Sequence, residues 1–124
     1  MSAKILVVDD EKNILSMLKI IFETEDFDVL TSENGKEALE IVEKEGPELV
    51  LLDLMMPVMD GFEVLTEMKN NQLINKIPVI IFSALKQDDI VEKALEMGAD
   101  DYVAKDSGPQ VLIEKVKETL NKKE

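Results

Sequence analysis

The sequence predicts an α/β fold in which helices cover both faces of a doubly wound, five-stranded parallel sheet. Apolar runs of strand length recur along the chain, at residues 5–8, 49–52 and 79–82. Segments with the apolar spacing of amphipathic helices lie between these runs. A strand that is apolar throughout is buried on both faces, and strands that alternate with helices are joined in parallel.

Five strand–helix pairs follow one another along the chain. The predicted strands are residues 3–8, 28–31, 48–53, 78–83 and 101–104. The predicted helices are residues 13–25, 34–44, about 60–70, 88–97 and a last helix that opens at 107–110. Right-handed connections leave few arrangements, and the flavodoxin-like order 2-1-3-4-5 is a common one for five strands. We expect residues 1–124 to form one domain.

Polar residues mark several helix starts. Asn34 and Glu37 have the spacing of a capping box, and Asp60 is predicted to cap the third helix. Ser107 is predicted to cap the last helix, with Pro109 in its first turn.

Composition excludes several kinds of protein. The chain has no cysteine and no histidine, which removes thiol chemistry, the commonest general base and the commonest zinc ligand. Its 14 basic and 27 acidic residues give a net charge of −13, so we expect no direct nucleic-acid binding. No apolar stretch is long enough to cross a membrane, and the start has no signal-peptide layout. We therefore expect a cytoplasmic protein without membrane insertion.

Residues able to do chemistry follow four of the predicted strands. Asp9 and Asp10 end the first strand, Asp53 ends the third, Ser83 ends the fourth and Lys105 follows the fifth. In open α/β sheets the ligand site lies beyond the carboxyl ends of the strands, where the strand order reverses. That point falls between the first and third strands, so we expect these side chains to converge.

The predicted cluster suits phosphoryl transfer with a divalent cation. Clustered carboxylates repel one another unless a cation lies among them, and hard oxygen ligands suit Mg²⁺. Asp53 could then attack a phosphoryl group as a carboxylate nucleophile, while Lys105 neutralises charge and Ser83 donates a hydrogen bond. Taken alone, Ser83 fits a helix cap and Lys105 a surface lysine. Their joint placement with the aspartates is what indicates a site.

Four segments of the sequence resemble a known family. The segments are ILVVDDE at residues 5–11, LDLMMP at 52–57 followed by Asp-Gly at 60–61, IIFSA at 80–84 and GADDYVAK at 98–105. Together they resemble response-regulator receiver domains of two-component signalling systems, in particular the stand-alone chemotaxis type. The resemblance covers the whole chain.

The resemblance implies a role for each residue of the predicted site. Asp53 would accept a phosphoryl group from a phosphohistidine of a sensor histidine kinase or phosphotransfer protein. Asp53 would bind Mg²⁺, or Mn²⁺ as a substitute, together with Asp9 or Asp10 and the backbone carbonyl of Met55. Asp10 is favoured as the direct ligand, with Asp9 acting through water. Ser83 and Lys105 would contact the phosphoryl group.

The resemblance also implies a switch. Ser83 and Tyr102 would form the switch pair, in which the hydroxyl moves toward the phosphoryl group and the ring turns inward. This would alter the face of the fourth helix, fifth strand and fifth helix for a downstream protein target. Without the resemblance, ordinary packing explains Tyr102 equally well.

One position departs from the family pattern. Receivers usually have a cis proline after the lysine, where this chain has Asp106. A cis bond before another residue costs about 2.5–4 kcal/mol, so we expect a trans bond. The altered loop would hold Lys105 less rigidly and make phosphorylation slower or the switch less complete.

Two other functions remain as alternatives to a switch that is not an enzyme. A small Mg²⁺-dependent phosphohydrolase with an aspartyl-phosphate intermediate typically needs an acid two residues after the nucleophile, where this chain has Met55. A docking module that is never phosphorylated is the other. As a natural stand-alone protein the chain would act through a partner or as a phosphate relay, and as a piece it would lack an attached output domain.

Overall fold

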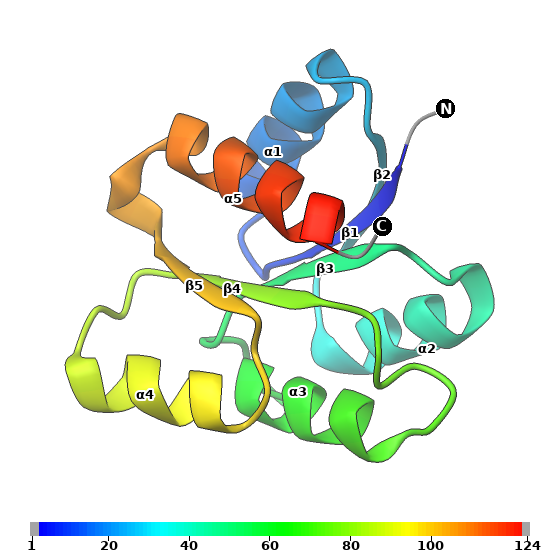
Figure 1. Cartoon of the computed structure of the whole chain (residues 1–124), viewed down its shortest axis with the longest axis vertical. Coiled ribbons are helices and arrows are strands. Elements are labelled where there is room, and N and C mark those ends of the chain that lie inside the picture. Colours follow the sequence, from blue (N-terminus) through cyan, green and yellow to red (C-terminus); the bar gives the residue numbers. More distant parts are fainter. Residues whose placement is uncertain (1–2, 123–124) are drawn as a thin grey trace.

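A computed structural model describes residues 3–122 and contains one parallel sheet (Figure 1). The five strands lie in the order β2-β1-β3-β4-β5, so the predicted fold class and strand order are confirmed. The strands are β1 (Lys4–Val8), β2 (Asp28–Ser32), β3 (Leu49–Leu52), β4 (Val79–Ser83) and β5 (Asp101–Ala104).

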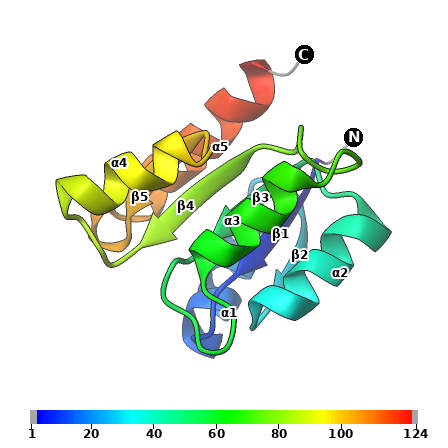
Figure 2. The same cartoon turned by 90° about the horizontal axis from the view of Figure 1, so that it is seen from below.

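Helices cover both faces of this sheet. They are α1 (Lys12–Thr24), α2 (Gly35–Glu45), α3 (Gly61–Asn70), α4 (Asp88–Glu96) and α5 (Pro109–Lys122), with a 3₁₀ turn at Lys105–Ser107. Helices α1 and α5 lie on one face, and α2, α3 and α4 on the other (Figures 1 and 2). None of the helices within residues 3–122 is long and apolar enough to cross a membrane.

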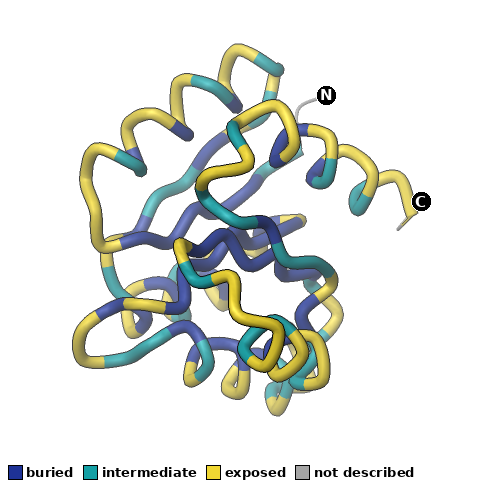
Figure 3. Tube along the Cα trace, turned by 90° about the vertical axis from the view of Figure 1, so that its left-hand side faces the viewer, coloured by how far each residue is buried: buried dark blue, intermediate teal, exposed yellow. Residues whose placement is uncertain are grey.

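Alternation along the strands divides the core into two layers. Ile5 and Val7 of β1 pack with Phe22 and the other apolar residues facing α1 and α5. Leu6 and Val8 face the layer of α2, α3 and α4. Successive strand side chains point to opposite faces, so an all-apolar strand is buried on both sides. The central strands are accordingly the most buried part of the chain (Figure 3).

The structure confirms the predicted helix caps at Asn34 and Asp60 but not the one at Ser107. The Asn34 side chain accepts a hydrogen bond from the Glu37 amide at 2.8 Å, which is one half of the predicted capping box. Asp60 caps α3 with a complete capping box. The predicted Ser107 cap is wrong, because Ser107 ends the 3₁₀ turn and Gly108 precedes α5. Gly108 has a φ of 91°, a left-handed conformation that glycine adopts without strain, and this changes the chain direction before the helix.

Candidate functional site

Strand register brings the predicted site residues to one edge of the sheet. Val8 pairs with Leu52, so the residues that follow them, Asp9 and Asp53, leave neighbouring strands at the same level. The Asp53 amide donates to the Val8 carbonyl at 3.0 Å and extends this pairing by one step. In the same way Ser83 pairs with the last residue of β5, directly before Lys105.

Three aspartates gather at this edge. Asp9, Asp10 and Asp53 each offer a carboxylate oxygen within 4.8 Å of the others. Asp9 and Asp53 are 1% and 3% exposed, whereas Asp10 is exposed. The Asp9 carboxylate accepts from the Glu11 amide at 2.9 Å, and Asp53 accepts weakly from the Met55 amide at 3.4 Å. These few hydrogen bonds leave most of the lone pairs in the cluster available to other partners.

Lys105 lies against the same cluster. Its Nζ is 2.8 Å from Asp9 Oδ2, 3.4 Å from Glu11 Oε1 and 3.5 Å from Asp53 Oδ2. No cis peptide bond occurs between residues 3 and 122, so the bond before Asp106 is trans as expected. The structure thus brings Lys105 to Asp53 with Asp106 in place of proline.

Burial and charge act together on Asp53. Its pKa is raised from 3.8 to about 6, first by burial and then by the negative charge of Asp9. The positive charge of Lys105 and the Met55 amide offset part of this rise. Burial lowers the pKa of Lys105, but its bond to Asp9 and the nearby carboxylates outweigh burial, so the net pKa is raised. Lys105 therefore stays protonated and acts as the counter-ion within the cluster.

Ser83 and Tyr102 lie beside this cluster. Ser83 is fully buried, and its Oγ accepts from the Leu85 amide at 3.2 Å. Tyr102 is partly buried against the core, and its hydroxyl donates to the Leu85 carbonyl at 2.8 Å. Burial raises the pKa of the Tyr102 phenol, the Ser83 hydroxyl lowers it, and the charge of Asp53 raises it further. Both side chains therefore contact the same residue of the loop after β4.

Sequence reasoning missed three features around the site. Glu11 contributes a third carboxylate to Lys105. Gly61 has no room for a side chain, because a Cβ there would lie 2.7 Å from Leu54 Cα, next to the Asp53 carbonyl. Lys86 pairs with Asp106 at 2.6 Å across two loops. The sequence does signal the constraint at Gly61, because a glycine directly follows the Asp60 cap. No sequence pattern links residues 86 and 106.

The aspartate cluster fits a hard divalent cation. Its donors are carboxylate oxygens, which Mg²⁺ prefers, and Asp10 is open to solvent for entry and for bound water. Burial, and after it the negative charge of Asp9, raises the pKa of Asp53, and a bound cation would favour the ionised carboxylate. The residues present therefore suit the ion that the sequence predicts.

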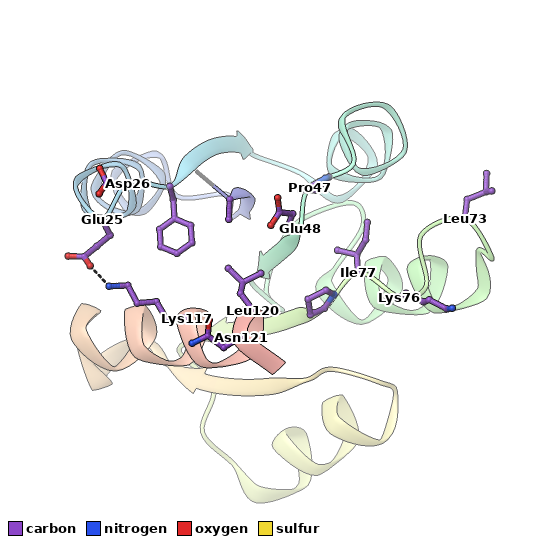
Figure 4. A pocket seen from close by; sticks show the side chains of 13 residues that line it. Glu25, Asp26, Pro47, Glu48, Leu73, Lys76, Ile77, Lys117, Leu120 and Asn121 are labelled. Atoms are coloured by element: carbon purple, nitrogen blue, oxygen red, sulfur yellow. Dashed lines mark hydrogen bonds and ion pairs between the residues drawn. The ribbon is translucent and has the colours of Figure 1, made fainter. Parts of the chain in front are cut away.

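A groove lies far from this cluster, at the opposite end of the strands (Figure 4). It is lined by Phe27, Glu48, Pro78, Lys117 and Leu120, which lie at or near residues that precede β2, β3 and β4 or close α5. None of the predicted site residues lines it. The groove therefore has no part in the chemistry of the aspartates.

The fold and the cluster together define a flavodoxin-like protein with an acidic site at the switch point of its sheet. The sequence matches the response regulator receiver domain family over residues 5–117, and the chain belongs to that family. Phosphorylation-dependent signalling and Mg²⁺ binding are typical of this family, whose receiver domains are signalling modules.

Similar proteins agree with this assignment. The chain is 38% identical over 124 residues to the alkaline phosphatase synthesis transcriptional regulatory protein PhoP of Bacillus subtilis, and 38% identical over 119 residues to the probable transcriptional regulator ycf27 of Porphyridium aerugineum. The matches cover 100% and 96% of this chain but 51% and 48% of those proteins, so it spans about half their length.

Solved receiver structures are also similar along their whole length. The Francisella response regulator 1452 receiver domain has a TM-score of 0.92 at 32% identity, with 99% of this chain and 100% of that chain covered. The CheY-like receiver of Methanospirillum hungatei JF-1 has a TM-score of 0.91 at 32% identity, covering 98% and 96%. The BeF3-activated receiver domain of Klebsiella pneumoniae RstA has a TM-score of 0.88 at 31% identity, covering 94% and 97%.

Proposed function

We propose that the chain is a phosphorylation switch in which Asp53 accepts a phosphoryl group from the phosphohistidine of a histidine kinase or phosphotransfer protein. The observation that carries the proposal is the position of Asp53: it is buried at the end of β3, beside Asp9 and 3.5 Å from the Lys105 ammonium. A carboxylate that meets both a like charge and a counter-ion in one crevice is a candidate for charge-changing chemistry.

In the proposed transfer the protein forms one covalent bond, through Asp53, and otherwise positions and neutralises the phosphoryl group. A carboxylate oxygen of Asp53 forms a bond to phosphorus as the bond from phosphorus to the donor imidazole nitrogen breaks. Lys105 neutralises charge on the transferred oxygens, and the Ser83 hydroxyl donates to one of them. Asp9, Asp10, Asp53 and the Met55 carbonyl would hold Mg²⁺, or Mn²⁺ in its place. The ion would supply positive charge to the phosphoryl oxygens.

The switch runs through Ser83 and Tyr102. A phosphoryl group adds charge and strong acceptors at Asp53, so it attracts the Ser83 hydroxyl. Ser83 Oγ accepts from the Leu85 amide, and the Tyr102 hydroxyl donates to the Leu85 carbonyl. A shift of Ser83 therefore changes the loop that Tyr102 holds, and with it the face formed by α4, β5 and α5. This face would bind a downstream protein target.

The setting of the proposed switch is the cytoplasm, where a kinase or phosphotransfer protein is its donor. The net charge of −13 argues against direct contact between this chain and nucleic acid. PhoP is named a transcriptional regulatory protein, and the chain corresponds to about half of it. We therefore propose that any output is exerted through protein contacts of the receiver.

Acetyl phosphate and intact-mass measurement test the proposal. The protein should gain one phosphoryl group with Mg²⁺ and almost none when the ion is chelated. Asp53→Asn should abolish the gain, and Asp28→Asn, an exposed aspartate at the start of β2, should not. Labelling that persists in Asp53→Asn would refute the role of Asp53. Continuous turnover of acetyl phosphate with no phosphoprotein would support a phosphohydrolase instead.

A further inference from the structure

An exposed ion pair joins two loops beside the proposed phosphoryl site. Lys86 Nζ lies 2.6 Å from Asp106 Oδ2, and the two side chains are 61% and 65% exposed. Lys86 belongs to the loop between β4 and α4, and Asp106 to the 3₁₀ turn after β5. The hydrogen bond and charge of Lys86 hold the pKa of Asp106 below its usual range, so the pair is ionised at neutral pH.

The pair acts next to a second link between the same segments. The Tyr102 hydroxyl of β5 donates to the Leu85 carbonyl at 2.8 Å, and Leu85 directly precedes Lys86. Two successive residues of the loop after β4 are thus tied to β5 and to the turn that follows it. The loop begins after Ser83, and the turn begins with Lys105. A contact between loop and turn therefore constrains both proposed phosphoryl-binding residues.

We propose that Lys86 and Asp106 are positioning residues whose ion pair keeps Ser83 and Lys105 directed at Asp53 at the same time. The inference rests on the proposed function, in which Ser83 and Lys105 contact the phosphoryl group. In this proposal the Asp106 carboxylate holds the loop between β4 and α4 through Lys86. The pair favours the arrangement that binds a phosphoryl group, and breaking it lowers the affinity of the site without removing any group that touches the ligand.

The effect is small because the pair is exposed to water. Exposed ion pairs contribute little to the free energy of folding. If the contribution of this pair acts only on the arrangement of the two loops, its loss weakens phosphoryl-ligand affinity roughly two- to five-fold. The effect fades at about 1 M salt, where charges a few ångströms apart in water are screened. A merely structural role would lower the midpoint of unfolding and leave the affinity unchanged.

Beryllofluoride with Mg²⁺ is the probe, followed by the fluorescence of Tyr102, because the chain has one tyrosine and no tryptophan. Lys86→Ala and Asp106→Ala should each weaken the apparent affinity roughly two- to five-fold. The double variant should be no weaker than either single variant, because each removes the same interaction. The charge swap of Lys86→Asp with Asp106→Lys should recover most of the affinity.

A matched pair at the other end of the strands is the control. Lys117 and Glu25 also lie 2.6 Å apart and join two elements, α5 and the end of α1 (Figure 4). Alanine at these two positions should change unfolding but leave beryllofluoride affinity unaltered. Independent losses at Lys86 and Asp106, or equal losses at the control pair, would overturn the positioning role alone. Failure of the unaltered protein to bind beryllofluoride with Mg²⁺ would instead overturn the proposed function as well.

Discussion

Replacing Asp53 by asparagine should stabilise the metal-free protein at neutral pH. Asp53 is 3% exposed, and burial together with the charge of Asp9 raises its pKa to about 6. The folded state therefore holds this proton more tightly than the unfolded state, in which the pKa is near 3.8. Ionisation of Asp53 removes stability as pH rises, beginning near the unfolded pKa and complete above the folded one. Asparagine keeps the shape of the side chain and cannot ionise.

The size of the effect follows from the two pKa values. At about 1.36 kcal/mol for each pKa unit, the gap between 3.8 and about 6 corresponds to about 3 kcal/mol at pH 7. About half of this remains at pH 5, and almost none below pH 4. The pKa of about 6 already includes the favourable contact of Asp53 with Lys105 at 3.5 Å, so losing that contact in the variant needs no separate correction. For a chain of this size we expect a rise in Tm of roughly 10–15 °C at pH 7.

Thermal and urea unfolding in the presence of a chelator, from pH 4 to pH 8, measure the effect. Comparing Asp53→Asn with the unaltered protein at each pH cancels the titration of the other carboxylates. Asp28→Asn is the control, since this exposed aspartate should change stability by less than about 0.5 kcal/mol at any pH. Equal stability of Asp53→Asn and the unaltered protein at pH 8 would refute the reasoning. So would a difference that grows on acidification.

Three further predictions follow from single features of the structure. Millimolar Mg²⁺ should raise the Tm of the unaltered protein clearly more than that of Asp53→Asn in the same scan, because the variant loses a charged ligand. Asp60→Ala should lower the free energy of unfolding in urea by about 1 kcal/mol, because it removes the carboxylate that accepts from the Glu63 amide at 2.9 Å in the α3 capping box. Val58→Gly should raise that free energy by about 1 kcal/mol, because Val58 is 99% exposed with a φ of 70°, a conformation that strains a β-branched residue; an unchanged urea midpoint would contradict this.

The fold could be predicted because its signals are local and repeated. Five strand-like segments, three of them apolar throughout and each followed by a helical pattern, leave few alternatives to a doubly wound sheet. The strand predicted at residues 101–104 has the observed bounds Asp101–Ala104. Ser107 was misjudged because a cap and a 3₁₀ turn use the same polar residues, and the left-handed Gly108 decides between them. The positive φ of Val58 could not be foreseen, because β-branched residues disfavour it.

The site could be predicted only where the topology itself brings residues together. Parallel strands end at the same edge, so Asp9 and Asp53 had to be neighbours once the strands were assigned. The pairing of Lys86 with Asp106 joins two exposed side chains 20 residues apart, and no periodicity connects them. From sequence alone Asp106 was an extra negative charge that would loosen Lys105. In the structure the Asp106 carboxylate is paired with Lys86. The effect of Asp106 on Lys105 therefore could not be predicted from its residue type alone.

Charge balance explains why a cation belongs in the proposed chemistry. Four carboxylates, of Asp9, Asp10, Glu11 and Asp53, meet one ammonium of Lys105, which leaves a formal charge of −3. A phosphoryl group on Asp53 would bring this to about −4, around a side chain that is already destabilised by its neighbours. A divalent cation would lower that total to about −2, and the phosphoryl oxygens would still accept from the Ser83 hydroxyl and the Lys105 ammonium. The cost of burying Asp53 beside Asp9 and the proposed requirement for Mg²⁺ therefore have the same electrostatic origin.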